Sequence, residues 1–232
     1  MKVIILAAGR GSRMSSETEN KPKCLVPLNG RPLIEHAIQK VSKYIPKDEI
    51  IIVTGYRSDL LEYLGIRTIH NSDWSTSNIM GSLLKADEIL DTDDAMVIYS
   101  DIFFDETAID LAISSSIPGV ISLNNWLQIW STRFADPLVD VEGFKAHDGR
   151  ITHIGGHVES ITEVQGQFAG IFTLNPQTWQ ILKSLPNFSN LDTTTALNKI
   201  ISLGVHLTEI SYSDRWLEFD SIADMTSQEK LI

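Results

Sequence analysis

The sequence predicts an α/β fold, with a Rossmann-like, mostly parallel sheet that is flanked by helices. Short apolar runs recur along the first half of the chain, as in strands that are buried on both faces. Stretches with apolar residues at helical spacing separate these runs, and such alternation is typical of a parallel sheet. After Asn124 the runs are punctuated by glycine, which indicates a small antiparallel extension.

Strands and helices are expected to alternate strictly up to residue 123. The first strand is a continuous apolar run, and Pro32 suits the first turn of the helix that follows because no partner is needed there for a backbone N–H. The strands are expected at residues 3–6, 50–53, 66–69, 95–99 and 120–123, and the helices at 32–41, 60–64, 79–90 and 107–113.

The second half of the chain is expected to complete the same domain. The sequence shows no internal repeat and no linker, so residues 1–232 form one compact unit. The strands are expected at residues 138–141, 150–154, 168–174, 205–210 and 216–219, and the helices at 176–185, 194–203 and from Ile222 onward.

Charge and cysteine content exclude several classes of protein. The chain has 19 Lys and Arg residues against 30 Asp and Glu residues, so a nucleic-acid-binding surface is not expected. The single cysteine, Cys24, excludes an intrachain disulfide and fits a reducing compartment. The apolar run at residues 3–8 is too short for a signal peptide or a membrane span. A cytoplasmic protein without a membrane partner is therefore expected.

A glycine-rich loop follows the first expected strand. Its small residues let backbone N–H groups approach a phosphate or a base. Met14 replaces the third glycine of a dinucleotide fingerprint, and the Lys-Ser/Thr pair of a Walker loop is missing. With Arg10 and Arg13 the loop is either a phosphate site or merely a tight turn. Its sequence is Leu6-Ala7-Ala8-Gly9-Arg10-Gly11-Ser12-Arg13.

Together with the Pro22-Lys23 pair, this loop resembles the signature of the sugar-phosphate nucleotidyltransferase superfamily. That signature reads Leu-Ala-Ala-Gly-x-Gly-x-Arg, followed by Pro-Lys. The resemblance implies that Arg13 and Lys23 are catalytic groups that neutralise phosphate charge. Fixed cations aimed at the charge that develops on pyrophosphate lower the barrier. The residues implied in nucleotide binding are Leu6, Ala7, Ala8, Gly9 and Gly11.

Two carboxylates end predicted strands at opposite ends of the sequence. Asp101 follows the strand at 95–99, and ligands gather at the carboxyl ends of strands in an open α/β sheet. Along the last strand, alternation places Trp216, Glu218 and Asp220 on one polar face, outside the core. Asp101 is therefore expected near the glycine-rich loop.

Asp101 and Asp220 are the candidate ligands of a magnesium ion. Mg²⁺ prefers one or two carboxylates together with phosphate oxygens and water. The superfamily pattern is Gly-Asp after the strand and Glu-x-Asp-Thr/Ser near the end. The sequence has Ser100-Asp101 and Glu218-Phe219-Asp220-Ser221, a match with one substitution. The alternative is that Asp101 caps the helix near Thr107.

The segment 71–83 resembles the Asn-x-x-Trp/Tyr-x-x-Thr-Asn-x-x-Ser-Leu motif of the phosphocholine and phosphonate cytidylyltransferase branch. In that branch the segment lies against the pyrimidine, which implies contacts from Asn78 and Ser82 to cytosine. The alternative is that Ser77 or Asn78 caps the next helix, and both roles are compatible.

The second half resembles the cytidylyltransferases of phosphonate biosynthesis, including 2-aminoethylphosphonate cytidylyltransferase. Residues 1–123 then form the nucleotide-binding half, and residues 124–232 form the acceptor side with its antiparallel extension. Aromatic faces and carboxylates would hold the acceptor's ammonium, and a bidentate arginine its phosphonate. The tryptophans are equally typical of core residues. The acceptor candidates are Trp126, Trp130, Arg133, Asp140, Glu142, Trp216 and Glu218.

The expected reaction is a Mg²⁺-dependent transfer of CMP from CTP to 2-aminoethylphosphonate, with release of pyrophosphate. The acceptor oxygen is ionised at neutral pH, so no general base is needed. Phosphocholine and sugar 1-phosphates are alternative acceptors, and a regulatory module that binds nucleotide without catalysis is an alternative of another class. The sequence leaves open whether the chain forms a homodimer.

Overall fold

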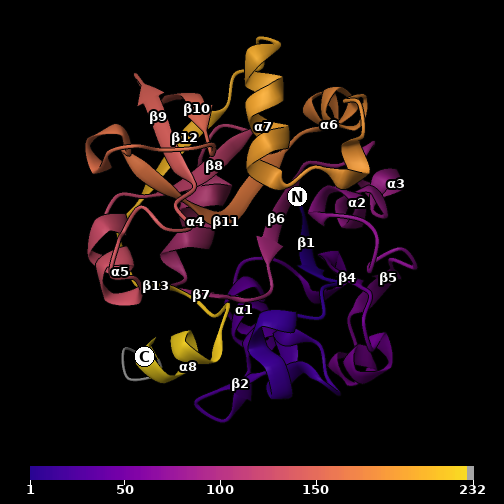
Figure 1. Ribbon diagram of the computed structural model, residues 1–232. Helices are drawn as coiled ribbons and strands as arrows, with labels where there is room; N and C mark the ends of the chain where they lie inside the picture. The colour runs from indigo at the N-terminus through magenta and orange to yellow at the C-terminus, as the bar shows by residue number, and fades with distance from the viewer. Residues whose placement is uncertain (229–232) are drawn as a thin grey trace.

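The computed structural model describes residues 1–228. One nine-stranded mixed sheet lies between two layers of helices (Figure 1). Its strand order is β5-β4-β1-β6-β11-β8-β12-β10-β9. The mixed α/β fold confirms the predicted class.

The first half of the chain builds a parallel block of four strands. Each strand pairs parallel with its neighbours. Successive side chains along a strand point alternately into two hydrophobic cores, one on each face of the sheet. Val3, Ile5 and Ala7 face one core, whereas Ile4 and Leu6 face the other. The four strands are β1 (Lys2–Ala7), β4 (Ile50–Thr54), β5 (Arg67–His70) and β6 (Ala95–Tyr99).

The sequence suggested that the antiparallel strands form a simple extension at one side of the sheet. The structure differs, because one antiparallel strand lies in the middle of the sheet. β11 (Gly166–Leu174) enters between β6 and β8 (Gly119–Leu123) and runs antiparallel to both. All nine residues of β11 are buried, which fits a central strand. β12 (Thr208–Tyr212) then pairs parallel to β8, and β10 (Arg150–Ile154) and β9 (Gly143–His147) close the edge.

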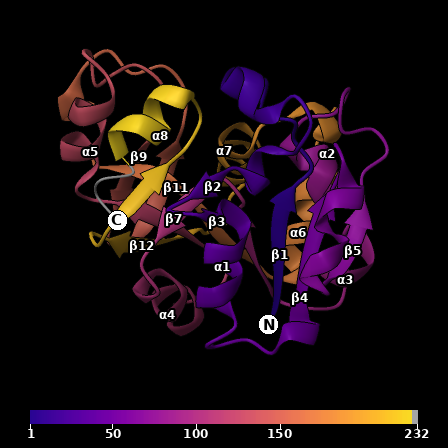
Figure 2. The same ribbon diagram turned by 90° about the horizontal axis from the view of Figure 1, so that it is seen from below.

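Helices cover the two faces of the sheet through separate cores (Figure 2). The predicted helix at 79–90 is divided because the backbone of Ala86 leaves the helical region, with ψ at 20°. One face carries α1 (Leu33–Val41), α4 (Thr107–Ser114) and α5 (Trp126–Arg133); the other carries α2 (Ile79–Leu84), α3 (Asp87–Leu90), α6 (Pro176–Lys183) and α7 (Thr193–Ser202).

The strand expected at 138–141 is absent from the described structure. Pro137 stands just before this segment, and Asp140 has a φ of 61°, so the backbone turns there instead. The segment expected as a helix at 60–64 is 3₁₀-helical. The 3₁₀ helices are η1 (Ser12–Thr18), η2 (Lys23–Leu25), η3 (Lys47–Glu49), η4 (Ser58–Leu64), η5 (Ile161–Glu163) and η6 (Phe188–Asn190).

Two small ribbons and a last helix complete the molecule. β7 (Ile102–Phe104) pairs antiparallel with β13 (Trp216–Glu218), and α8 (Ile222–Gln228) follows. β2 (Pro27–Leu28) pairs with β3 (Arg31–Pro32). Within residues 1–228, every helix is too short or too polar to cross a membrane.

Candidate active site

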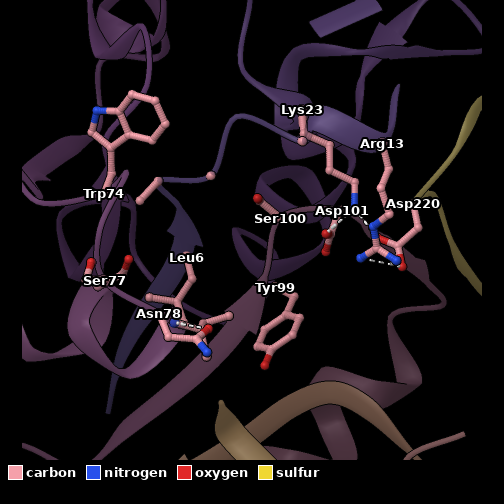
Figure 3. Close-up of a pocket in the computed structure, with 15 residues that line it drawn as sticks. Leu6, Arg13, Lys23, Trp74, Ser77, Asn78, Tyr99, Ser100, Asp101 and Asp220 are labelled. Atoms are coloured by element: carbon pink, nitrogen blue, oxygen red, sulfur yellow. Dashed lines mark hydrogen bonds and ion pairs between the residues drawn. The ribbon is translucent and has the colours of Figure 1, made fainter. Parts of the chain in front are cut away.

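A cavity of about 300 Å³ lies at the carboxyl ends of β1 and β6. Figure 3 shows that its two ends differ in character. One end gathers charged side chains, and the other is lined by neutral and aromatic ones. The charged end holds Arg13, Lys23, Asp101 and Asp220; the neutral end holds Trp74, Ser77, Asn78, Ile79 and Ser82. We call this space the nucleotide cavity.

The charged end is organised around one lysine. Lys23 Nζ lies 2.6 Å from Asp101 Oδ2 and also donates to Asp220 Oδ1. Arg13 Nη2 lies 3.4 Å from Asp220 Oδ2. Burial opposes the charge of Lys23, but the two carboxylates raise the pKa of its ammonium above the usual range. The four charged residues that the sequence selected therefore converge.

The ribbon of β7 and β13 brings the two aspartates together. Asp101 immediately precedes β7, and Asp220 lies two residues beyond β13. Glu218 pairs with Ile102, and Phe219 N donates to Asp101 O at 3.0 Å. Backbone pairing thus fixes the distance between carboxylates that are far apart in sequence. The alternative helix-capping role for Asp101 is not seen, because α4 begins at Thr107.

Gly11 is packed directly against Lys23. Its φ is +78°, and a Cβ built there would lie 2.6 Å from Lys23 Cβ. The carbonyl of Gly11 accepts a hydrogen bond from Thr18 Oγ1 at 2.7 Å, which holds the loop. A side chain at this position would strain the backbone and displace the lysine stem.

Gly11→Ala is therefore expected to lower kcat/KM by about 100-fold, because a shift of about 1 Å in a catalytic group has effects of this size. Gly149→Ala is a matched control, since Gly149 also has positive φ (+71°) but has no atom within 4 Å of its built Cβ. Gly149→Ala should lose about 1 kcal/mol of stability through backbone strain alone, and Gly11→Ala should lose more because of its added contact with Lys23. Steady-state kinetics and thermal unfolding separate the two effects. Full activity of Gly11→Ala would show that the packing against Lys23 is unimportant.

The neutral end confirms the predicted cap. Asn78 Oδ1 accepts from Ile79 N at 2.7 Å, and Asn78 still lines the cavity (Figure 3). Ser82 lies one turn further along α2. The sequence argument had not selected Trp74 or Tyr99, which also line the cavity. Trp74 lies within the segment 71–83 that resembles the cytidylyltransferase motif, and Tyr99 directly precedes Ser100 and Asp101.

The side chain of Ala7 does not line the cavity. Alternation along β1 turns it into the core on the opposite face, while Leu6 faces the cavity. The other predicted loop residues, Ala8, Gly9 and Gly11, are at the cavity surface. The resemblance implied that the backbone from Leu6 to Gly11 binds the nucleotide, so the role of Ala7 concerns its backbone and stays a prediction.

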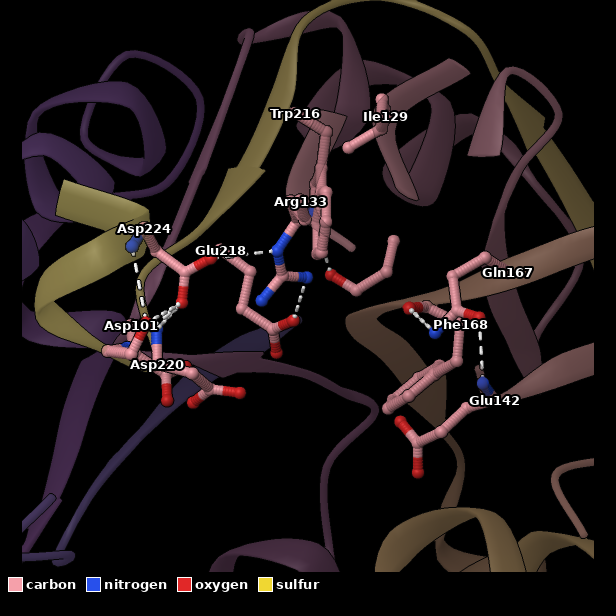
Figure 4. Close-up of polar contacts among 12 residues, drawn as sticks. Asp101, Ile129, Arg133, Glu142, Gln167, Phe168, Trp216, Glu218, Asp220 and Asp224 are labelled. Carbon is pink, nitrogen blue, oxygen red and sulfur yellow. Dashed lines mark hydrogen bonds and ion pairs between the residues drawn. The ribbon is translucent and has the colours of Figure 1, made fainter. Parts of the chain in front are cut away.

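A second space, of about 230 Å³, adjoins the charged end of the nucleotide cavity. Asp140, Glu218 and Asp220 each offer a carboxylate oxygen within 4.8 Å of the others. Glu142 and Gln167 complete the wall (Figure 4). We call this space the acidic pocket. Arg13, Tyr99, Asp101 and Asp220 border both spaces.

Several carboxyl groups of the acidic pocket have raised pKa values, because burial and neighbouring negative charges disfavour their ionised forms. Burial raises the pKa of Glu142 to about 7, although its carboxylate accepts from Thr194 Oγ1 at 3.0 Å. Burial and the charge of Asp220 raise the pKa of Glu218 to about 8. Burial also raises the pKa of Asp140. A cation bound here would relieve this repulsion.

Arg133 does not face the acidic pocket as an open acceptor site. Its side chain is 1% exposed, and it binds Glu218 at 2.7 Å and Asp224 at 3.0 Å (Figure 4). Asp224 in turn accepts from Ser221 N at 2.9 Å. The predicted contact between Arg133 and a phosphonate is corrected, because Arg133 is not among the residues that line the pocket and its Nε and Nη1 already bind two carboxylates.

The three predicted acceptor tryptophans are core residues. Trp126, Trp130 and Trp216 are at most 4% exposed and belong to one hydrophobic cluster. Trp130 and Trp216 stack at 5.7 Å, and Trp216 Nε1 donates to Ala169 O at 2.9 Å. Helix α5 was not foreseen, and its packing on the sheet buries them. Trp216 is thus not on a polar face, whereas Glu218 and Asp220 do reach the pocket.

The donor set suits a divalent cation. Asp101 Oδ1 is buried and has no hydrogen-bond partner among the residues described, so one oxygen is free for a ligand bond. Burial opposes ionisation of Asp220, but Lys23 lowers the pKa of its carboxyl below the usual value. Two carboxylates side by side at the charged end of the cavity match the preferences of Mg²⁺.

Comparison with known proteins places the chain in a family. Residues 3–119 match the model of the MobA-like NTP transferase domain. The CTP:phosphoglutamine cytidylyltransferase of Campylobacter jejuni is 28% identical over 98% of this chain and 99% of its own length. The CMP-5'-(3-aminopropyl)phosphonate synthase of Streptomyces rubellomurinus is 30% identical over 47% of this chain and 18% of its own length.

A solved structure supports the same fold. The CTP:phosphocholine cytidylyltransferase from Streptococcus pneumoniae superposes with a TM-score of 0.77 at 22% identity, covering 99% of this chain and 98% of the other. The matched family model spans the glycine-rich loop, Lys23 and Asp101, which form most of the charged end. The chain therefore belongs to the MobA-like NTP transferase family, within the sugar-phosphate nucleotidyltransferase superfamily, and is a nucleotidyltransferase.

Proposed function

We propose that the chain transfers CMP from CTP to a small phosphonate that carries a primary amine, with 2-aminoethylphosphonate as the best candidate. The observation that carries this proposal is the acidic pocket beside the charged end of the nucleotide cavity. Two of its carboxyl groups have pKa values raised to about 7 and about 8, so a cationic group is favoured there.

The triphosphate of CTP would lie at the charged end of the nucleotide cavity. Arg13 and Lys23 would bind its oxygens and stabilise the charge that develops on pyrophosphate. Asp101 and Asp220 would hold Mg²⁺, which neutralises phosphate charge when bound. The base would lie at the neutral end, against Ser82 and its neighbours.

The lining of the acidic pocket favours a primary over a quaternary amine. A primary ammonium has N–H donors for carboxylates, whereas a trimethylammonium group is best held by several aromatic faces. Tyr99 is the one aromatic side chain among the described residues that line this pocket. A relative named for an aminopropylphosphonate product supports the same class.

The proposed step is an in-line displacement at the α-phosphorus of CTP. An ionised oxygen of the acceptor forms the new P–O bond, and the bond to pyrophosphate breaks, so no proton has to be removed. Arg13, which borders both spaces, is placed to attract the acceptor's negative end towards the triphosphate. Positioning and charge stabilisation supply the rate enhancement.

A screen of pyrophosphate release tests the proposal. CTP with 2-aminoethylphosphonate should react with a kcat/KM at least about tenfold above that with ethylphosphonate, which lacks only the amine. Phosphocholine and glucose 1-phosphate should be poorer acceptors. The assay belongs above neutral pH, where the Glu142 carboxyl is mostly ionised because its pKa is about 7.

The screen also separates the alternatives. Equal rates with 2-aminoethylphosphonate and ethylphosphonate would contradict the amine subsite. A preference for glucose 1-phosphate with UTP would indicate a sugar nucleotidyltransferase. Binding of CTP without pyrophosphate release across the whole panel would favour a nucleotide-binding regulatory module.

A further inference from the structure

We propose that Asn71 is a positioning residue that makes the Ser82 hydroxyl a hydrogen-bond donor towards the base, and thereby selects cytosine over uracil. Asn71 itself does not line the nucleotide cavity, whereas Ser82 does. The proposal rests on the proposed use of CTP and concerns the residue that sets this preference.

The side chain of Asn71 is fully buried, and its hydrogen bonds fix the orientation of its amide group. It is 0% exposed, and its Oδ1 accepts a hydrogen bond from the backbone N of Asp73 at 3.0 Å. Because a backbone N–H can only donate, the amide nitrogen must point the other way. Asn71 Nδ2 then donates to Ser77 Oγ at 3.1 Å and to Ser82 Oγ at 3.0 Å.

The two serines differ in where their own protons go. Ser77 Oγ donates to Asp73 O at 2.9 Å, so its hydroxyl is satisfied within the protein. Ser82 Oγ accepts from Asn71, and no acceptor for its proton is found among residues 1–228. Ser82 is 7% exposed and borders the cavity. Its proton is therefore available to a ligand at the neutral end.

The pairing edges of the two pyrimidines respond oppositely to such a donor. Cytosine N3 is an acceptor, whereas uracil N3 carries a hydrogen and is a donor. The Ser82 hydroxyl, which accepts from Asn71, can donate its proton to cytosine N3. If it instead accepted from uracil N3–H on its second lone pair, its own proton would be left without an acceptor. An unsatisfied donor of this kind in a buried site is rejected strongly.

Asn71→Asp tests the polarity with almost no change of shape. The introduced carboxylate can only accept, so the Ser82 hydroxyl should turn and donate to it, and present a lone pair to the base. The ratio of kcat/KM for CTP to that for UTP should fall by about tenfold or more, mainly through KM. At acid pH, where a buried carboxyl is protonated and regains a donor, the ratio should recover.

Two further variants keep the test decisive. Ser82→Ala removes the donor and should lower the ratio as well; adding Asn71→Asp to Ser82→Ala should then have no further effect on the ratio. Asn175→Asp is the matched control, because Asn175 caps α6 far from the cavity and should leave the ratio unchanged. An unchanged ratio in folded Asn71→Asp would overturn the role of Asn71. An unchanged ratio in Ser82→Ala would overturn the inference even if Asn71→Asp folded poorly. Failure of the wild-type chain to use CTP would instead overturn the proposed function.

Discussion

Lys23→Ala is expected to lower kcat by roughly two to three orders of magnitude, or about 2.7–4 kcal/mol of barrier, as for the loss of one preorganised electrostatic contact. Lys23 is the cation closest to both Asp101 and Asp220, and its side chain is only 11% exposed. Its stem is also held by the glycine-rich loop through Gly11. A group fixed in this way stabilises developing charge without reorganisation.

Pyrophosphate release at saturating CTP, acceptor and magnesium measures this effect. Lys21→Ala is the matched control, because Lys21 forms an i,i+4 ion pair with Glu17 at 3.3 Å near the surface, and its loss should change kcat little. If Lys23→Ala retained wild-type kcat, the assignment of Lys23 as a catalytic group would be wrong.

Asp220→Asn is expected to raise the magnesium concentration needed for half-maximal activity by about tenfold or more, since even outer-sphere partners of a metal contribute at this level. Asp220 lies at the junction of the two spaces, where Lys23, Arg13 and two other carboxylates meet it. The Asn side chain has nearly the same shape as that of Asp but carries no charge. The affinity for the metal should therefore fall, while the folding stability should change little.

A magnesium titration of initial rates measures the requirement directly. Asp148→Asn provides the control, because the Asp148 side chain is 90% exposed on a turn, where it lies beside His147. The same magnesium dependence in Asp220→Asn and the wild-type chain would exclude Asp220 as a metal ligand, and would shift attention to Asp101 alone.

Local patterns predicted the parallel half of the fold well. The buried runs at β1, β4 and β6 carry their strand identity in the sequence, because strands buried on both faces must be continuously apolar. The insertion of β11 between β6 and β8 could not be predicted in this way. Strand order depends on pairings between distant segments, and neither periodicity nor turn residues encode it.

The site residues likewise fall into those that the sequence could predict and those that it could not. The charged end was predictable because the motif residues and the ends of strands place Lys23 and Asp101 at one edge of the sheet. Arg133 and the tryptophans were not, because an unforeseen helix, α5, buries Trp126 and Trp130 and turns Arg133 towards Glu218. The catalytic and metal-binding roles themselves remain predictions.

The placement of one ammonium between two carboxylates has a thermodynamic consequence. Lys23 acts as an internal counter-ion for Asp101 and Asp220. When a triphosphate attracts this ammonium, both carboxylates lose their compensating charge together, and a divalent cation restores it. Nucleotide and cation should therefore each tighten the binding of the other, because a linkage between two ligands is reciprocal. The exchange of counter-ions would make the binding of nucleotide and cation cooperative.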